Sequence, residues 1–226
     1  MECHCPEGKG SGGLMLVTLS GIDGSGKSTL SHHIQKHLKD SYAIRSRLTW
    51  CKFGAHPFMS AMEWFRRWQS AANKTRETRQ RAIPAPKRMY YYYLLFFHYL
   101  QLIGIFISVR IRRQTVICDR YIYDSMVDVQ QEFLVSRTKS YALFDKEWIR
   151  KPDLSFWLEV PASLAMPRKP ETGAVDYLAF RERLYAHVAG DYSLYAIDAS
   201  APIDQVVRRV CEQLDCKIKE RSASAE

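Results

Sequence analysis

The feature that most constrains the fold is a glycine-rich turn between an apolar run and an amphipathic segment. From Gly21 the sequence reads Gly-Ile-Asp-Gly-Ser-Gly-Lys-Ser, which fits the pattern G-x-x-x-x-G-K-[ST] at every fixed position. The preceding residues 14–20, LMLVTLS, are typical of a buried parallel strand. From Leu30 to Leu38, apolar residues recur at every fourth position, as on one face of a helix. The sequence therefore predicts a strand, a tight turn and a helix N-terminus in succession.

This succession predicts a phosphate-binding loop rather than a plain turn that happens to carry a lysine. The backbone N–H groups from Gly24 to Ser28 would surround a phosphate, and the positive end of the helix dipole would lie behind them. Glycines let the backbone approach the ligand closely and adopt positive φ. The residues expected to bind the phosphates are Gly21, Gly24, Ser25, Gly26, Lys27, Ser28 and Thr29.

The rest of the chain repeats the order of strand and helix that is typical of α/β proteins with a parallel sheet. Four further strands are expected, at residues 42–48, 115–119, 154–160 and 193–200. After the last of them, Pro202 opens an amphipathic helix. The predicted fold is a doubly wound, five-stranded parallel sheet with helices on both faces.

A single domain is expected from residue 14 to residue 216. Residues 1–13 lack the apolar core of a signal peptide, so we expect a disordered leader there. Residues 217–226 are expected to form a polar tail. Residues 70–87 are polar, basic and interrupted by prolines, which predicts a mobile loop within the domain.

Charge and cysteine content narrow the function. The formal net charge of +9 favours anionic ligands. The basic residues are scattered and form no nucleic-acid recognition motif, so no nucleic-acid partner is expected. The six cysteines show neither a zinc-site spacing nor a secreted disulfide framework, which predicts a reducing, cytoplasmic location. Cys118 is expected to pack in the core.

Residues 90–109, YYYYLLFFHYLQLIGIFISV, are long and apolar enough to be considered as a membrane span. Several polar residues interrupt the run, and basic residues flank both of its ends rather than one. A helix buried on most sides in an α/β domain explains the same pattern. We favour the buried helix, and a peripheral contact with a membrane remains the alternative.

A second chemical signal lies at the end of the strand TVICD. The acid Asp119, at the end of a strand beside the loop, would hold the water shell of a Mg²⁺ ion, and Ser28 would supply a hydroxyl ligand. Arg120 follows at the carboxyl end of the strand, where ligands bind in such sheets. Its guanidinium fork suits a phosphate. An ordinary surface turn with an ion pair is the alternative.

Together these segments resemble the thymidylate kinase family of nucleoside monophosphate kinases, from residue 14 to about residue 214. The segments that carry the resemblance are GIDGSGKST, DRY at 119–121, PDLSFWLEVP from Pro152, RKPE at 168–171 and IDAS at 197–200. The resemblance implies a P-loop NTPase-type sheet of order 2-3-1-4-5 with a lid. It also implies ATP and Mg²⁺ as cofactors, transfer of the γ-phosphoryl group to a nucleoside monophosphate such as dTMP, and a homodimer.

The resemblance also assigns roles to residues. Lys27 would bridge the β- and γ-phosphates, Arg120 would clamp the acceptor, and Asp23 would contact the acceptor side. Some family members carry an arginine in the loop where this chain has Ser25, so the missing cation is expected from a lid at about 166–174. The lid cations are Arg168 and Lys169, and the base-side loop contributes Ala199 and Ser200.

The acceptor half departs from the family pattern. The arginine expected after the second strand is absent from LTWCKFGAHPF, where Lys52 is the candidate substitute. The family's third helix carries an arginine that reads the base; here aromatic residues stand in its place, and His98 is the polar candidate. After DRY, the family's serine and glutamine match Ser125 and Gln130 only if one extra residue is allowed. Two alternatives therefore remain: a specialised kinase for a nucleoside, a sugar phosphate or a lipid-linked acceptor, and a non-catalytic nucleotide-binding module.

Overall fold

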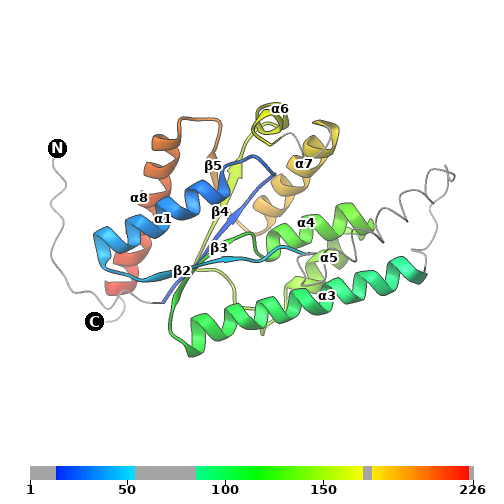
Figure 1. Ribbon diagram of the computed structural model, residues 1–226, viewed down its shortest axis with the longest axis horizontal. Coiled ribbons are helices and arrows are strands. Elements are labelled where there is room, and N and C mark those ends of the chain that lie inside the picture. The colour runs from blue at the N-terminus through cyan, green and yellow to red at the C-terminus, as the bar shows by residue number, and fades with distance from the viewer. Residues whose placement is uncertain (1–13, 54–84, 170–174, 224–226) are drawn as a thin grey trace.

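The protein is a parallel β-sheet with helices on both faces (Figure 1). The computed structural model describes residues 14–53, 85–169 and 175–223. The five strands are β1 (Leu16–Ser20), β2 (Ser46–Trp50), β3 (Thr115–Asp119), β4 (Leu154–Glu159) and β5 (Tyr195–Asp198). All neighbouring strands are parallel, in the order β2-β3-β1-β4-β5. The α/β class, the parallel sheet and its order are therefore as predicted.

The helices divide between the two faces of the sheet. They are α1 (Lys27–Tyr42), α3 (Ala85–Phe106) with a π-helical turn at Ile107–Ile111, α4 (Ile122–Phe133), α5 (Arg137–Phe144), α6 (Ala162–Ala165) with a 3₁₀ turn at Met166–Arg168, α7 (Val175–Asp191) and α8 (Ile203–Ala223). In Figure 1, α1 and α8 lie on one side of the sheet, and α3, α4, α5 and α7 on the other. This layering matches the expected doubly wound arrangement.

Two boundaries differ from the prediction by more than two residues. Residue Tyr42, expected in the second strand, is the last residue of α1, because Ala43 adopts a left-handed conformation (φ 53°) and its N–H bonds back to the carbonyls of the last turn. The strand β2 accordingly begins at Ser46. At the other end of the chain, α8 continues to Ala223 through residues expected to form a tail, and Ile218 is buried. The periodic apolar side of α8 extends this far and packs on the domain.

Some predictions fall outside the described residues. They concern the leader at 1–13, residues 70–84 of the basic loop, residues 170–174 of the lid and the last three residues. The end of the expected loop, residues 85–87, belongs to the first turn of α3.

The central strand β1 positions the site. All five of its residues are buried, and it pairs with β3 on one side and with β4 on the other. Leu19 lies opposite Asp119 in this register. The turn that follows β1 and the acid that ends β3 therefore emerge at the same edge of the sheet, where ligands bind in open α/β folds.

Candidate functional site

The site begins at the N-terminus of α1. Gly26 precedes the first helical residue, Lys27, and takes a left-handed conformation (φ 90°, ψ 10°) with no side chain to cap the helix. The first N–H groups of a helix have no partner within it. Together with the helix dipole, they make this end attractive to an anion.

Two glycines of the turn are required for different reasons. A Cβ on Gly24 would lie 2.3 Å from the carbonyl oxygen of Ala165, and its φ is 85°. A Cβ on Gly26 would meet nothing within 4 Å, but its φ of 90° is also one that L-residues rarely adopt. Gly24 is therefore needed for space and conformation, and Gly26 for conformation alone.

The ammonium group of Lys27 lies inside the turn. Its Nζ donates hydrogen bonds to the carbonyl oxygens of Gly21 (2.7 Å) and Ile22 (2.6 Å) and to Ser25 Oγ (3.0 Å), and the residue is only 5% exposed. Burial lowers the pKa of Lys27 to about 7; repulsion by Arg120 acts in the same direction, and nearby aspartates oppose it. This buried cation is held by neutral oxygens of its own loop and is near enough to bind a phosphate there.

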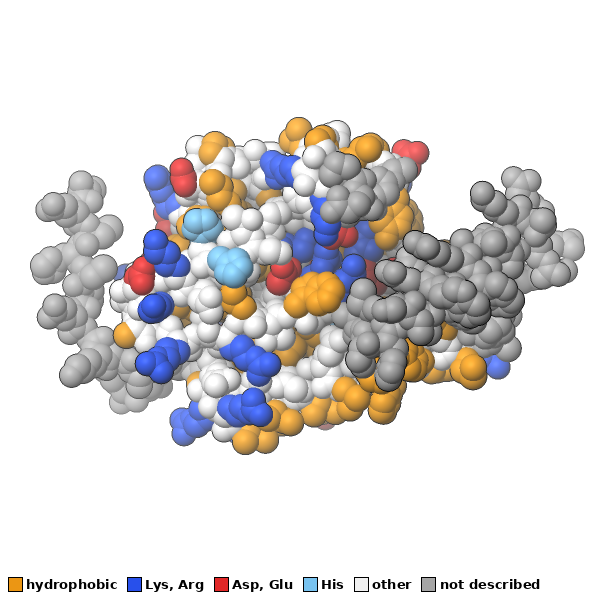
Figure 2. Space-filling view, in the orientation of Figure 1, with side chains coloured by type: hydrophobic (Ala, Val, Ile, Leu, Met, Phe, Trp, Pro, Cys, Tyr) orange, Lys and Arg blue, Asp and Glu red, His pale blue; other side chains and the backbone are white. Residues whose placement is uncertain are grey.

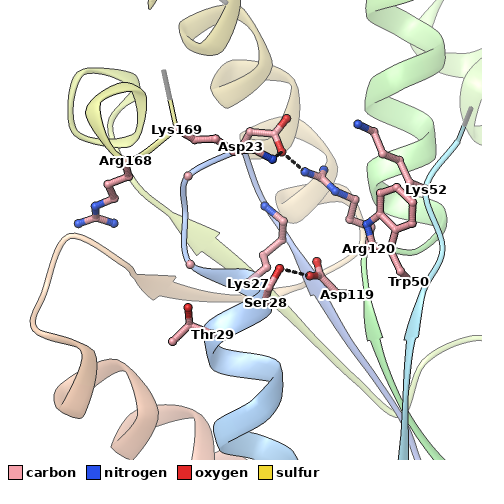
Figure 3. A pocket seen from close by; sticks show the side chains of 12 residues that line it. Asp23, Lys27, Ser28, Thr29, Trp50, Lys52, Asp119, Arg120, Arg168 and Lys169 are labelled. Atoms are coloured by element: carbon pink, nitrogen blue, oxygen red, sulfur yellow. Dashed lines mark hydrogen bonds and ion pairs between the residues drawn. The ribbon is translucent and has the colours of Figure 1, made fainter. Parts of the chain in front are cut away.

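Ser28 and Asp119 meet beside the turn, as the sequence predicted. Ser28 Oγ donates to Asp119 Oδ2 at 2.5 Å, and Asp119 Oδ1 is buried without a hydrogen-bond partner (Figure 3). A hydroxyl and a carboxylate with a spare oxygen fit Mg²⁺. No group of three or more His, Cys, Asp or Glu side chains within the described ranges could hold a metal ion. A Mg²⁺ ion here would complete its coordination with water and substrate phosphates, as is usual for this metal.

Arg120 is buried in a strained position directly after β3. Its φ is 74°, a rare conformation for a residue with a side chain, and only 4% of its surface is exposed. Its guanidinium forms an ion pair with Asp23 of the turn and another with Asp124 of α4 at 3.3 Å. Strain of this kind is held by surrounding structure and is concentrated at functional sites. The conformation directs this cation toward the turn.

Asp23 links the turn to the cations around it. Burial raises the pKa of its carboxyl, but attraction by Arg120, Lys27, Lys52 and Lys169 outweighs burial, so that the pKa lies below its usual value. The Nζ of Lys169 lies 3.7 Å from Asp23 Oδ1. The carboxylate thus stays ionised at neutral pH and orients Arg120.

A buried polar network behind Arg120 was not foreseen from the sequence. Asp124, fully buried, accepts hydrogen bonds from Ser20 Oγ and Tyr185 OH, both at 2.7 Å. One turn further along α4, Asp128 pairs with Arg181 at 2.5 Å, and both are at most 3% exposed. The signal in the sequence was the position of these two acids, four residues apart and among mostly apolar neighbours, because buried carboxylates need partners. The network holds Arg120 in place.

These groups surround a pocket of about 370 Å³. The predicted site residues that line it are Asp23, Gly24, Gly26, Lys27, Ser28, Thr29, Lys52, Asp119, Arg120, Arg168 and Lys169. Figure 3 shows Arg168 on one side of the turn and Lys52 with Trp50 on the other. Trp50 is 52% exposed and also lines the pocket.

A smaller cavity of about 140 Å³ adjoins the turn on the side of β5. It is lined by Ser25, Gly26, Arg168 and Ala199, among others. Arg168 Nη1 also donates to the carbonyl of Ala199 at 3.3 Å. Ser200 instead donates its backbone N–H to Asp198 Oδ1 at 2.9 Å. The expected base-side loop therefore brings Ala199, and not the side chain of Ser200, to the cavity.

Three predicted acceptor residues do not line the pocket. His98 is 1% exposed, and its Nε2 lies 2.8 Å from Ser125 Oγ. The Nδ1 of His98 lies 4.0 Å from the sulfur of Cys51. Gln130 donates to the carbonyl of Met126, one turn earlier in α4, at 3.1 Å. These polar groups bond to one another or to their own helix in the packed layer below the site.

Comparisons with models of known protein families and with curated protein sequences gave no match. The resemblance to thymidylate kinases accordingly rests on the sequence motifs alone.

Proposed function

We propose that this protein is an ATP- and Mg²⁺-dependent phosphotransferase with a P-loop NTPase-type, thymidylate kinase-like site, which transfers the γ-phosphoryl group of ATP to a nucleoside monophosphate. The observation that carries the proposal is the meeting of Lys27, Ser28 and Asp119 at the N-terminus of α1. Arg120, buried and strained in the same pocket, adds a cation that nucleotide binding alone would not require.

The donor side of the pocket suits a polyphosphate. The N–H groups at the start of α1 would bind the β-phosphate, and the ammonium of Lys27 would leave its loop carbonyls to contact the β- and γ-phosphates. When bound by Ser28 and Asp119, Mg²⁺ would neutralise charge on the phosphate oxygens. The adjoining cavity beside Ala199 would receive the rest of the nucleotide.

The acceptor side suits a group that is already anionic. The pocket is lined by the cations Lys27, Lys52, Arg120, Arg168 and Lys169, against the two acids Asp23 and Asp119. A phosphate monoester is largely a dianion at neutral pH, so its oxygen can attack the γ-phosphorus without a general base while ADP leaves. The guanidinium of Arg120 would hold that phosphate, and Asp23 would keep the guanidinium oriented.

A second candidate keeps the same chemistry with another acceptor. His98, Ser125 and Gln130 make their hydrogen bonds away from the pocket, whereas an exposed tryptophan, Trp50, lines it. A site without buried partners for a thymine base loses much of its selectivity for that base. On this reading dTMP is a poor substrate, and a different nucleotide, a sugar phosphate or a lipid-linked phosphate is preferred.

The test is a measurement of ADP release from ATP and Mg²⁺ with panels of nucleoside monophosphates, nucleosides and sugar phosphates. We expect ADP release above the no-acceptor background with at least one phosphorylated acceptor. The variant Lys27→Met should show no such ADP release. Tight ATP binding without release for any acceptor would instead identify a non-catalytic nucleotide-binding module. A kcat/KM for dTMP of about 10⁴ M⁻¹s⁻¹ or more would reject the second candidate.

A further inference from the structure

Helix α3 is apolar on the side that faces solvent as well as on the side that faces the core. Tyr91, Leu94, Leu95, Leu102 and Ile105 are buried and belong to the hydrophobic core. A surface helix of a globular protein normally turns charged and polar residues toward water on its other side. In α3 that other side carries hydrophobic side chains.

The exposed side chains form a continuous row, which we call the α3 stripe. Its members and their exposed fractions are Met89 (75%), Tyr92 (60%), Phe96 (58%), Leu100 (46%), Ile103 (41%) and Phe106 (37%). They recur in steps of three and four residues and so lie along one side of the helix. Figure 2 shows hydrophobic side chains along the lower edge of the molecule, where Figure 1 places α3. Single exposed apolar residues are normal, but a row of this length indicates an interaction surface.

The charged side chains of the α3 segment itself are all basic. Residues 85–114 contain no aspartate or glutamate. Exposed arginines lie at both ends: Arg88 near the start of α3, and Arg110, Arg112 and Arg113 after its last turn. The partner that complements this surface is therefore apolar along its middle and negatively charged around it.

We infer that the α3 stripe docks on the surface of an anionic lipid bilayer, with the helix axis in the membrane plane. Tyr92 and Phe96 would enter the boundary between headgroups and acyl chains, and the terminal arginines would contact lipid phosphates. A second copy of this chain fits less well, because packing two α3 helices along their length would bring basic ends against basic ends, and residues 85–114 contain no acid to pair them.

The packing of the buried side of α3 favours a helix that lies on the membrane surface over one that crosses the membrane. The segment Arg88–Ile111 is long and apolar enough to cross a bilayer, and 39% of its most apolar part is buried inside the protein. Crossing would remove Leu94, Leu102 and Ile105 from the core that they share with the sheet. A contact in the membrane plane leaves that packing intact.

A cavity beside the α3 stripe is lined by basic, polar and apolar side chains. It measures about 370 Å³ and lies between β2 and the C-terminal part of α3, lined by Arg47 and Arg112 together with Ile105 and Ile107. Guanidinium groups next to apolar side chains suit an anionic headgroup and the start of its chains. Trp50 lines both this cavity and the candidate phosphotransfer site. Docking would thus bring the candidate site close to the membrane surface.

The test is flotation of the full chain with vesicles of phosphatidylcholine alone or with added phosphatidylglycerol. The wild type should float with the anionic vesicles, less so at high salt, and only weakly with the neutral ones. The triple variant Phe96→Ser/Leu100→Ser/Ile103→Ser should lose roughly tenfold or more in bound fraction. Because these side chains are exposed, the variant should keep its fold, which its thermal melting curve checks.

A matched control changes three exposed apolar residues elsewhere: Leu134→Ser, Val175→Ser and Phe180→Ser. This variant should float as the wild type does. The inference is overturned if the wild type ignores anionic vesicles or if the stripe variant still binds them. It is also overturned if sedimentation shows a dimer that the stripe substitutions dissociate while vesicle binding is absent. Since the measurement is binding alone, its outcome is independent of phosphotransfer.

Discussion

The buried ammonium of Lys27 makes the stability of this protein depend on pH in a way that one substitution can isolate. In the folded chain, burial and then repulsion by Arg120 lower the pKa of Lys27 from 10.5 to about 7. In the unfolded chain the group is solvated and returns to the ordinary value. Between these two pKa values the unfolded chain holds a proton that the folded chain has lost.

The sign and size of the effect follow from this difference in bound protons. Where the unfolded state binds one more proton, the free energy of unfolding rises by about 1.4 kcal/mol per pH unit. At pH 7 the folded group is still half protonated, so from pH 7 to pH 9 the contribution of Lys27 is about 2 kcal/mol, in the direction of greater stability at higher pH. Below the folded pKa both states are protonated, and the cost of the buried charge becomes constant.

The assay is urea unfolding of the wild type and of Lys27→Met at several pH values between 7 and 9. The difference in unfolding free energy, wild type minus variant, should rise by about 2 kcal/mol across this range. Lys36→Met, which changes an exposed lysine of the same helix, is the control and should follow the wild type. Parallel curves for wild type and Lys27→Met would refute the reasoning, because the lysine would then titrate alike in both states.

Four further substitutions test other parts of the site and the network behind it. Asp119→Asn should raise the Mg²⁺ concentration for half-maximal ADP release by about tenfold or more, measured by metal titration, since the variant loses the charge behind the metal's water shell. Gly24→Ala should destabilise the protein by about 2 kcal/mol more than Gly26→Ala in urea unfolding, because only the former also places a Cβ against a carbonyl oxygen. Asp128→Ala should cost about 3–5 kcal/mol in the same assay, since it leaves the buried guanidinium of Arg181 unpaired.

Local patterns in the sequence were enough to predict the frame of the protein. The runs that became β1, β3 and β4 are short and mostly apolar, so they could be recognised as buried strands without knowledge of their neighbours. The turn at Gly24 and the acid at Asp119 were recognisable because each lies directly after such a run. Since the carboxyl ends of parallel strands share one edge, their proximity followed from the predicted fold and its implied strand order.

The tertiary structure decided which polar groups meet and which side of each helix is covered. Asp124 and Asp128 gain their partners from β1 and α7, far away in sequence, and His98 lies in the core because α3 turns that side toward α4. No periodicity could have assigned the two sides of α3, since it is apolar all round. The hydrophobic pattern of a sequence indicates which side chains can be buried. Packing against particular neighbours determines which of them are buried.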